Sequence, residues 1–167
     1  MQRFKKILVG VDLGWGDRFV THQLSPPNAS AVDQAVWLAR LNGASVGFLF
    51  ALDLSAKAQQ LITENSETEA MQAERTAAEQ QLQKELAGSP VAAAAKVHLV
   101  TQPPVDAIIQ CIESEKIDLV VMGTVSRTGI SGLITGNTAE QLLSRIRCSL
   151  LAVKPSGFSS PVQLDDT

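Results

Sequence analysis

Short apolar runs recur along the chain, and their spacing predicts a parallel sheet. Five runs rich in β-branched residues occupy residues 7–11, 46–51, 96–100, 119–122 and 150–153. Each run is nearly continuous rather than alternating, which is typical of a strand covered on both faces. The pattern therefore predicts five buried parallel strands.

Helical patterns fill the intervals between these runs. Apolar residues with i, i+3, i+4 and i+7 spacing occur within residues 32–39, 105–112 and 139–146. Ser30 is the expected N-cap of the first helix, and Pro104 suits the first position of the second. A further helix is expected over residues 64–86, which are rich in Ala, Glu and Gln and contain neither Gly nor Pro.

The alternation of strands and helices predicts a doubly wound α/β fold with a five-stranded parallel sheet. Such a Rossmann-like fold carries helices on both faces, and its crossovers are right-handed. Ligands bind to these sheets at the carboxyl ends of the strands, where the strand order reverses. The turns after Val11, Ala51 and Met122 are therefore the places to look for a site.

The length of 167 residues suits one domain, expected over residues 1–155, with a tail at 156–167. The connection at about residues 13–28 is long and contains Trp15, Phe19, Pro26 and Pro27. Connections of this length are uncommon and are often functional or mobile. A disordered insertion and a lid over the site both remain open.

Composition excludes several classes of protein. A net charge of −3 gives no basic field for nucleic acid, and the apolar runs are too short to cross a membrane. The first residues lack the long apolar core of a signal peptide, so a cytoplasmic location is expected. Cys111 and Cys148 share no metal-like spacing and are interpreted as buried spectator thiols. His98 lies in a strand pattern and is interpreted as a core or face residue whose polar atoms are satisfied.

Residues 121–140 carry the clearest candidate chemistry. A strand that ends at Met122 is followed by a loop rich in Gly, Ser and Thr, and a helix is expected to open near Asn137. Backbone N–H groups of such loops bind phosphates, and hydroxyl and guanidinium groups add donors. The side chains offered as donors are those of Thr124, Ser126, Arg127 and Thr138. A ligand-free interpretation also stands, because Asn137 and Glu140 form an ordinary capping pair.

Two positions at the ends of other strands complete the candidate site. Asp12 follows the first strand, where a carboxylate binds a ribose hydroxyl or helps to hold Mg²⁺ through water. A plain turn or capping role explains Asp12 equally well. The backbone of Ala51 is placed to meet the edge of a base, although packing alone also explains that residue.

The chain resembles the universal stress protein family over nearly its whole length. The first strand ends in Val11-Asp12, the second closes at Asp53, and the glycine loop precedes the last helix. Nucleotide-binding members carry G-x-x-G, nine residues, then G-[Ser/Thr]. Here Gly123 and Gly136 keep the spacing, whereas Ser126 and Asn137 replace the second glycine and the hydroxyl residue. The last part of the chain is most similar to the second half of E-type universal stress proteins, which are usually tandem two-domain chains.

This resemblance implies an adenine nucleotide alpha hydrolase-like fold and a stress-response protein that binds ATP or AMP. Val11, Asp12 and the Ala51 backbone would face the base and ribose. The ribose and phosphates would be surrounded by Met122, Gly123, Ser126, Gly136, Asn137 and Thr138. The resemblance also implies a homodimer formed through the last strand, Leu150 to Val153, whose open apolar edge invites pairing.

The resemblance implies nucleotide binding rather than catalysis. The loop contains no His, Glu or Asp to activate water, so any loss of ATP would be weak and incidental. His22 lies in the long connection, where nothing fixes its distance from the site. The alternatives are a dimeric interaction protein that binds no nucleotide, and a binder of another, apolar ligand enclosed by Trp15 and Phe19.

Overall fold

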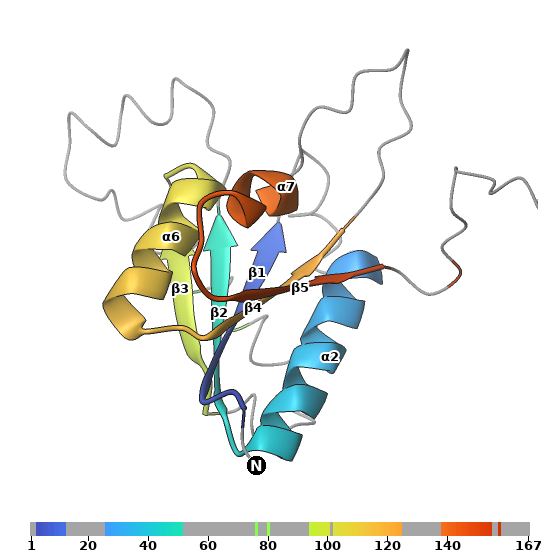
Figure 1. Ribbon diagram of the computed structural model, residues 1–167. Coiled ribbons are helices and arrows are strands. Elements are labelled where there is room, and N and C mark those ends of the chain that lie inside the picture. Colours follow the sequence, from blue (N-terminus) through green and yellow to red (C-terminus); the bar gives the residue numbers. More distant parts are fainter. Residues whose placement is uncertain are drawn as a thin grey trace, which may run out of the picture.

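The computed structural model describes residues 3–12, 26–51, 76, 80, 94–100, 102–124, 138–154 and 157. Five strands run through this part of the chain (Figure 1). They are β1 (Lys6–Asp12), β2 (Ser45–Ala51), β3 (Lys96–Val100), β4 (Leu119–Gly123) and β5 (Ser149–Val153). All five apolar runs of the sequence are therefore strands, with ends within one residue of those expected.

The strands form one sheet in which every neighbouring pair is parallel, in the order β3-β2-β1-β4-β5. The chain moves outward from β1 to β3 and then returns to the other side of β1 for β4 and β5. The strand order thus reverses between β1 and β4, as a doubly wound sheet requires. This confirms the predicted fold class.

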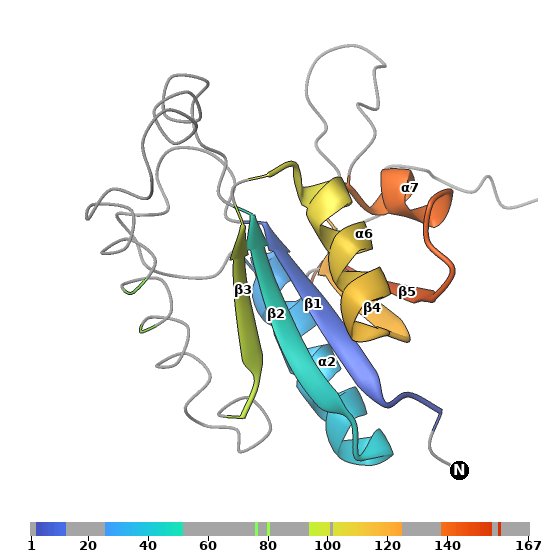
Figure 2. The same ribbon diagram turned by 90° about the vertical axis from the view of Figure 1, so that its left-hand side faces the viewer.

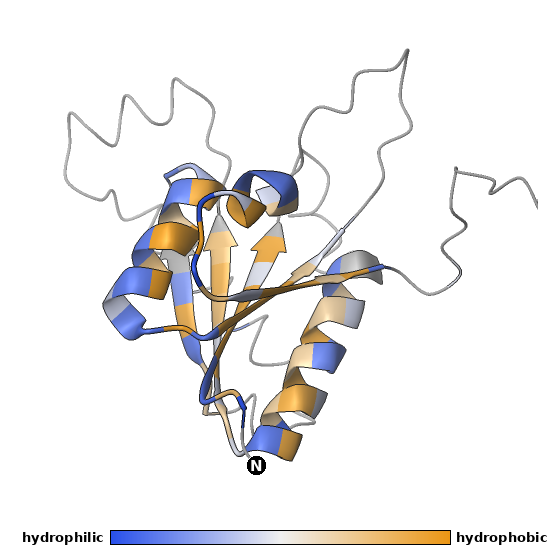
Figure 3. Ribbon diagram, viewed as in Figure 1, coloured by the Kyte–Doolittle hydropathy of each residue, from blue (hydrophilic) through white to orange (hydrophobic). Residues whose placement is uncertain are grey.

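Helices cover both faces of the sheet (Figure 2). One face is covered by α2 (Pro26–Asn42), and the other by α6 (Pro104–Glu115) and α7 (Thr138–Leu143). Successive residues of the central strands point to opposite faces of the sheet. Val9 therefore packs in the core under α2, and Leu8 in the core under α6. Figure 3 shows mostly apolar central strands, and helices along which polar and apolar residues alternate.

The helix boundaries differ from the sequence prediction at two places. Because α2 begins at Pro26, Ser30 lies inside the helix and is not its N-cap. Proline is tolerated in a first helical turn, where its missing N–H costs no hydrogen bond. In contrast, α6 begins at Pro104 as predicted. The last helix ends at Leu143, so Ile146 follows it in a turn while still packing against the core.

Other predicted segments lie largely outside the described residues. Of residues 64–86, the structure describes Thr76 and Gln80, and both are helical. The connection after β1 is described from residue 26, where it has already become α2, and the tail is described at Gly157. Among the described helices, none is both long and apolar enough to cross a membrane.

Candidate functional site

Three strand ends meet at the carboxyl edge of the sheet. The last residue of β1, Asp12, pairs in register with Ala51, the last residue of β2. On its other side, β1 pairs with β4, with Gly10 opposite Met122. The ends of β1, β2 and β4 therefore lie side by side at the point where the strand order reverses (Figure 1).

Apolar side chains form the floor beneath this edge. Val11 is 2% exposed and packs in the core on the α2 face, whereas Met122 is 6% exposed and packs on the α6 face. Gly10 lies between them, and a Cβ there would meet Met122 and Ile108 at 3.4 Å. Packing on the two faces of the sheet thus fixes the side chains of Val11 and Met122.

Thr124 already has a partner within the protein. It is 5% exposed, its N–H donates to the carbonyl of Val153 at 2.8 Å, and its hydroxyl lies 3.4 Å from the same oxygen. These bonds join the residue after β4 to the end of β5. The predicted donation from Thr124 to a phosphate would have to compete with them.

The remaining predicted residues fall on the segment after β4. Gly123 ends that strand opposite Val153 and is partly buried, and Thr138 is the first residue of α7 and is also partly buried. The other members, Ser126, Arg127, Gly136 and Asn137, lie outside the described residues. The structure thus fixes both ends of the glycine segment at the carboxyl side of β4 and at α7.

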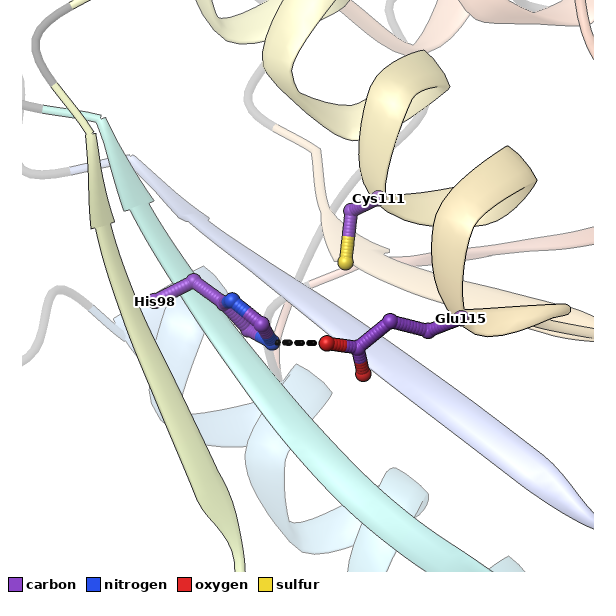
Figure 4. A group of neighbouring side chains, drawn as sticks. All are labelled: His98, Cys111 and Glu115. Atoms are coloured by element: carbon purple, nitrogen blue, oxygen red, sulfur yellow. Dashed lines mark ion pairs between the residues drawn. The ribbon is translucent and has the colours of Figure 1, made fainter.

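A second group of polar side chains lies between β3 and α6, and sequence spacing did not reveal it. His98, Cys111 and Glu115 turn toward one another (Figure 4), and their potential ligand atoms all lie within 4.8 Å of each other. His98 comes from β3, and the other two are one turn apart on α6. Only the packing of the helix on the strand brings the three together.

The interpretation of His98 as a core or face residue with satisfied polar atoms is wrong for one atom, Nε2. Its Nε2 lies 3.4 Å from Glu115 Oε1, yet the geometry does not make a hydrogen bond. This nitrogen is buried with no hydrogen-bond partner among the described residues. Buried polar atoms are usually paired, so His98 calls for an explanation.

Charge and burial set the ionisation of the group. The Lys96 ammonium, bonded to the Glu115 carboxylate, holds the pKa of that carboxyl below its usual range, with partial burial opposing and His98 adding to the effect. Burial and the charge of Glu115 raise the pKa of the Cys111 thiol to about 11, while Lys96 opposes this shift. Glu115 is therefore an anion and Cys111 a neutral thiol at neutral pH.

The sequence of the chain matches those of known proteins. A sequence model described as the universal stress protein family matches residues 3–154. Universal stress protein E of Escherichia coli K12 is 45% identical over 69 residues, which make up 41% of this chain and 22% of that protein. The match thus spans less than a quarter of the length of this curated relative.

Solved structures match over most of this chain. A Pseudomonas aeruginosa PAO1 protein of unknown function superposes with a TM-score of 0.64 at 28% identity, covering 91% of this chain and 48% of that one. A universal stress protein in complex with cAMP superposes with a TM-score of 0.57 at 22% identity, covering 92% of this chain and 98% of that one. At that identity the second likeness shows a common fold.

Proposed function

Because the chain belongs to the universal stress protein family, we propose that it is a stress-response regulator that binds an adenine nucleotide, ATP or AMP, in the cytoplasm. The observation that carries the proposal is the meeting of β1, β2 and β4 at one edge, where the glycine segment leaves β4. Nucleotides bind to doubly wound sheets at this kind of edge.

Different parts of the nucleotide are assigned to the strand ends and to the loop after β4. We assign the base and ribose to Val11, Asp12 and the Ala51 backbone, because β1 and β2 end there in register. The ribose and phosphates are assigned to Met122, Gly123 and the segment that runs to Thr138. Mg²⁺ would reach Asp12 through water if it accompanies the phosphates.

Two residues of the glycine segment set how tightly a nucleotide binds. Ser126 and Asn137 stand where nucleotide-binding family members carry Gly and Ser or Thr. A Cβ at residue 126 crowds a phosphate wherever the backbone needs a positive φ, whereas Asn tolerates that conformation well. We therefore expect weaker binding than a complete signature gives, with Ser126 as the larger cause.

The test is to measure binding to the purified full chain by calorimetry, with ATP–Mg²⁺, AMP and cAMP as separate ligands. The chain is also denatured, and any released nucleotide is identified by chromatography. Gly123→Val, which adds a branched side chain at the start of the loop, should weaken binding by about tenfold or more (~1.4 kcal/mol). Ser126→Gly, which restores the family residue, should tighten it.

A control is Ser45→Val, which places the same valine side chain at the exposed first residue of β2, at the amino end of the strands. It should leave nucleotide affinity unchanged. Absence of a released nucleotide together with no heat of binding in the wild type and in Ser126→Gly would end the proposal. Turnover of ATP that Gly123→Val abolishes would instead support a slow hydrolase.

A separate observation favours a protein-binding role. One of the two outer strands of the sheet is β5, in which Leu150, Leu151 and Val153 are only partly buried. An apolar edge strand with free main-chain groups is a template for pairing with a second copy. We therefore propose a homodimer formed through β5, which holds whether or not a nucleotide binds.

A further inference from the structure

The group between β3 and α6 has the donor atoms of a transition-metal site. An imidazole nitrogen, a thiol sulfur and a carboxylate oxygen converge from His98, Cys111 and Glu115 (Figure 4). Zn²⁺ is bound in proteins by these three ligand types, usually in a tetrahedral arrangement. Mg²⁺ and Ca²⁺ prefer oxygen ligands, so a site with nitrogen and sulfur donors does not suit them.

The distances suit one small ion. Zn²⁺ lies about 2.0 Å from nitrogen and oxygen and about 2.3 Å from sulfur, so the ligand atoms of a tetrahedral site with one sulfur are roughly 3.3 to 3.5 Å apart. The His98 Nε2 to Glu115 Oε1 separation of 3.4 Å already falls in this range. All three atoms lie within 4.8 Å of one another, so a small rotation of side chains completes the set.

The surroundings leave His98 Nε2 in need of a partner. The nitrogen is buried and lacks a hydrogen bond among the described residues. Beneath it lies Gly47 of β2, where a Cβ would stand 4.0 Å from Nε2. Gly47 therefore adds no side chain beneath the group. The side chains of His98 and Glu115 remain 20% and 26% exposed and give an ion a route in from solvent.

From these observations we propose that His98, Cys111 and Glu115 bind one divalent transition-metal ion of the Zn²⁺ class. The thiol of Cys111 releases its proton to solvent as the metal–sulfur bond forms, and neutral His98 binds through Nε2. One thiolate and one carboxylate then balance the two positive charges. Water fills the fourth position on the exposed side.

Lys96 competes with the metal ion for the carboxylate of Glu115. Its ammonium bonds to Glu115 Oε1, the same oxygen that faces His98. The Lys96 side chain is 66% exposed and can swing into water, leaving the carboxylate to the metal. Metal binding should therefore replace the Lys96–Glu115 ion pair.

The site is separate from the nucleotide edge. Glu115 ends α6 just before β4 begins, and Lys96 begins β3, so the group lies toward the amino ends of the strands. An ion held there joins β3, an edge strand, to α6. Because an ion that binds only the folded chain stabilises it, the metal should raise the unfolding temperature.

The experiment titrates chelator-treated, reduced full chain with Co²⁺ and then Zn²⁺. Co²⁺ should give intense visible bands of tetrahedral geometry and a thiolate charge-transfer band, with one ion per chain, and Zn²⁺ should displace it. A parallel thermal melt should show a rise in unfolding temperature that grows with Zn²⁺ concentration. Absence of the tetrahedral bands at saturating Co²⁺ would overturn the proposal.

Variants identify the ligands. Cys111→Ser should abolish the charge-transfer band, and His98→Gln and Glu115→Gln, on partly exposed side chains, should each weaken binding by about tenfold or more. The matched control is Cys148→Ser, which removes the other thiol and should change nothing. An equal loss in Cys148→Ser and Cys111→Ser would contradict the site.

One variant separates a metal site from a purely structural ion pair. Lys96→Met removes the competing ammonium at an exposed position, so it should tighten Co²⁺ binding while leaving the fold intact. Unchanged or weaker binding in Lys96→Met would show that Glu115 is not a ligand and would overturn the three-ligand site.

Discussion

The two cysteines differ in their surroundings. Cys111 is 6% exposed, as predicted, whereas Cys148, which was also predicted to be buried, is only partly buried just before β5. Burial raises the pKa of the Cys148 thiol, a backbone hydrogen bond opposes this shift, and the Asp118 carboxylate adds to it. Since the thiolate is the reactive form, the protein keeps Cys148 less reactive than an ordinary exposed thiol.

This leads to a pH prediction for Cys148. A raised pKa leaves less thiolate at any given pH, so the alkylation rate of Cys148 should rise at higher pH in the folded chain than in the chain unfolded in urea. The measurement is iodoacetamide labelling across a pH series in the presence of a chelator, followed by peptide mapping. Coincident pH profiles for the folded and unfolded chain would contradict the shift.

The sequence predicted residues at strand ends better than residues within them. Asp12, Ala51 and Met122 were placed at one edge because parallel strands share a direction, and the register confirms that placement. The burial of Cys111 is confirmed. Its closeness to His98 was not predicted, because it depends on how α6 packs on the sheet. The one available signal was the i, i+4 spacing of Cys111 and Glu115, which by itself is common on helices.

Among the elements, strands were easier to predict than helix ends. A strand buried on both faces leaves a continuous apolar run, so its limits are visible in the sequence. The start of α2 was misplaced by one turn because Ser30 looked like a cap, while Pro26 and Pro27 also fit a first turn. Capping residues and prolines thus allow more than one first residue for a helix, and the packing of the whole helix decides between them.

Both α2 and α6 are followed by a residue in the left-handed conformation, a glycine after α2 and a lysine after α6. Gly43, with φ of 61°, follows α2, and the N–H of Ala44 donates to the Ala39 carbonyl at 3.0 Å. After α6 the left-handed position is held by Lys116, with φ of 59° and ψ of 50°. A side chain in this region costs roughly 1–2 kcal/mol, which glycine avoids.

We therefore expect Lys116→Gly to stabilise the chain. Relief of the left-handed strain should exceed the added freedom of the unfolded chain, with a net gain of about 0.5–1 kcal/mol. The measurement is urea unfolding of metal-free protein. Glu113→Gly, on the exposed face of the same helix, is the matched control and should destabilise by about 1 kcal/mol. Destabilisation by both variants would show that Lys116 is not strained.

At the scale of the molecule, the sheet presents three separate surfaces. The carboxyl edge carries the proposed nucleotide site, the β3 side carries the proposed metal site, and β5 forms the far edge. The Pseudomonas structure matches this chain with 48% of its own length, so a fold of this size is about half of that protein. The proposed pairing would place a second copy of the fold against β5.

The hydrogen bonds between β4 and β5 show which main-chain groups of β5 face β4 and which face away from it. Ser149 N–H donates to the Asp118 carbonyl, and the Val153 carbonyl accepts from Thr124 N–H. Because alternate residues of a strand direct their main-chain groups to the same side, Ser149, Leu151 and Val153 face β4. The N–H and carbonyl groups of Leu150 and Ala152 therefore point away from β4, to the side where no strand of the described residues pairs with β5.

Ala152→Pro is the sharpest test of pairing through this edge. Proline removes an outward N–H at an exposed residue and leaves the hydrogen bonds to β4 in place, so the fold should persist while the dimer dissociates. Sedimentation at micromolar concentrations should show a dimer for the wild type and for Ala152→Ser, and a monomer for Ala152→Pro. Leu151→Pro should instead damage the sheet, because that N–H faces β4. A monomeric wild type, or an Ala152→Pro dimer of unchanged affinity, would exclude pairing through β5.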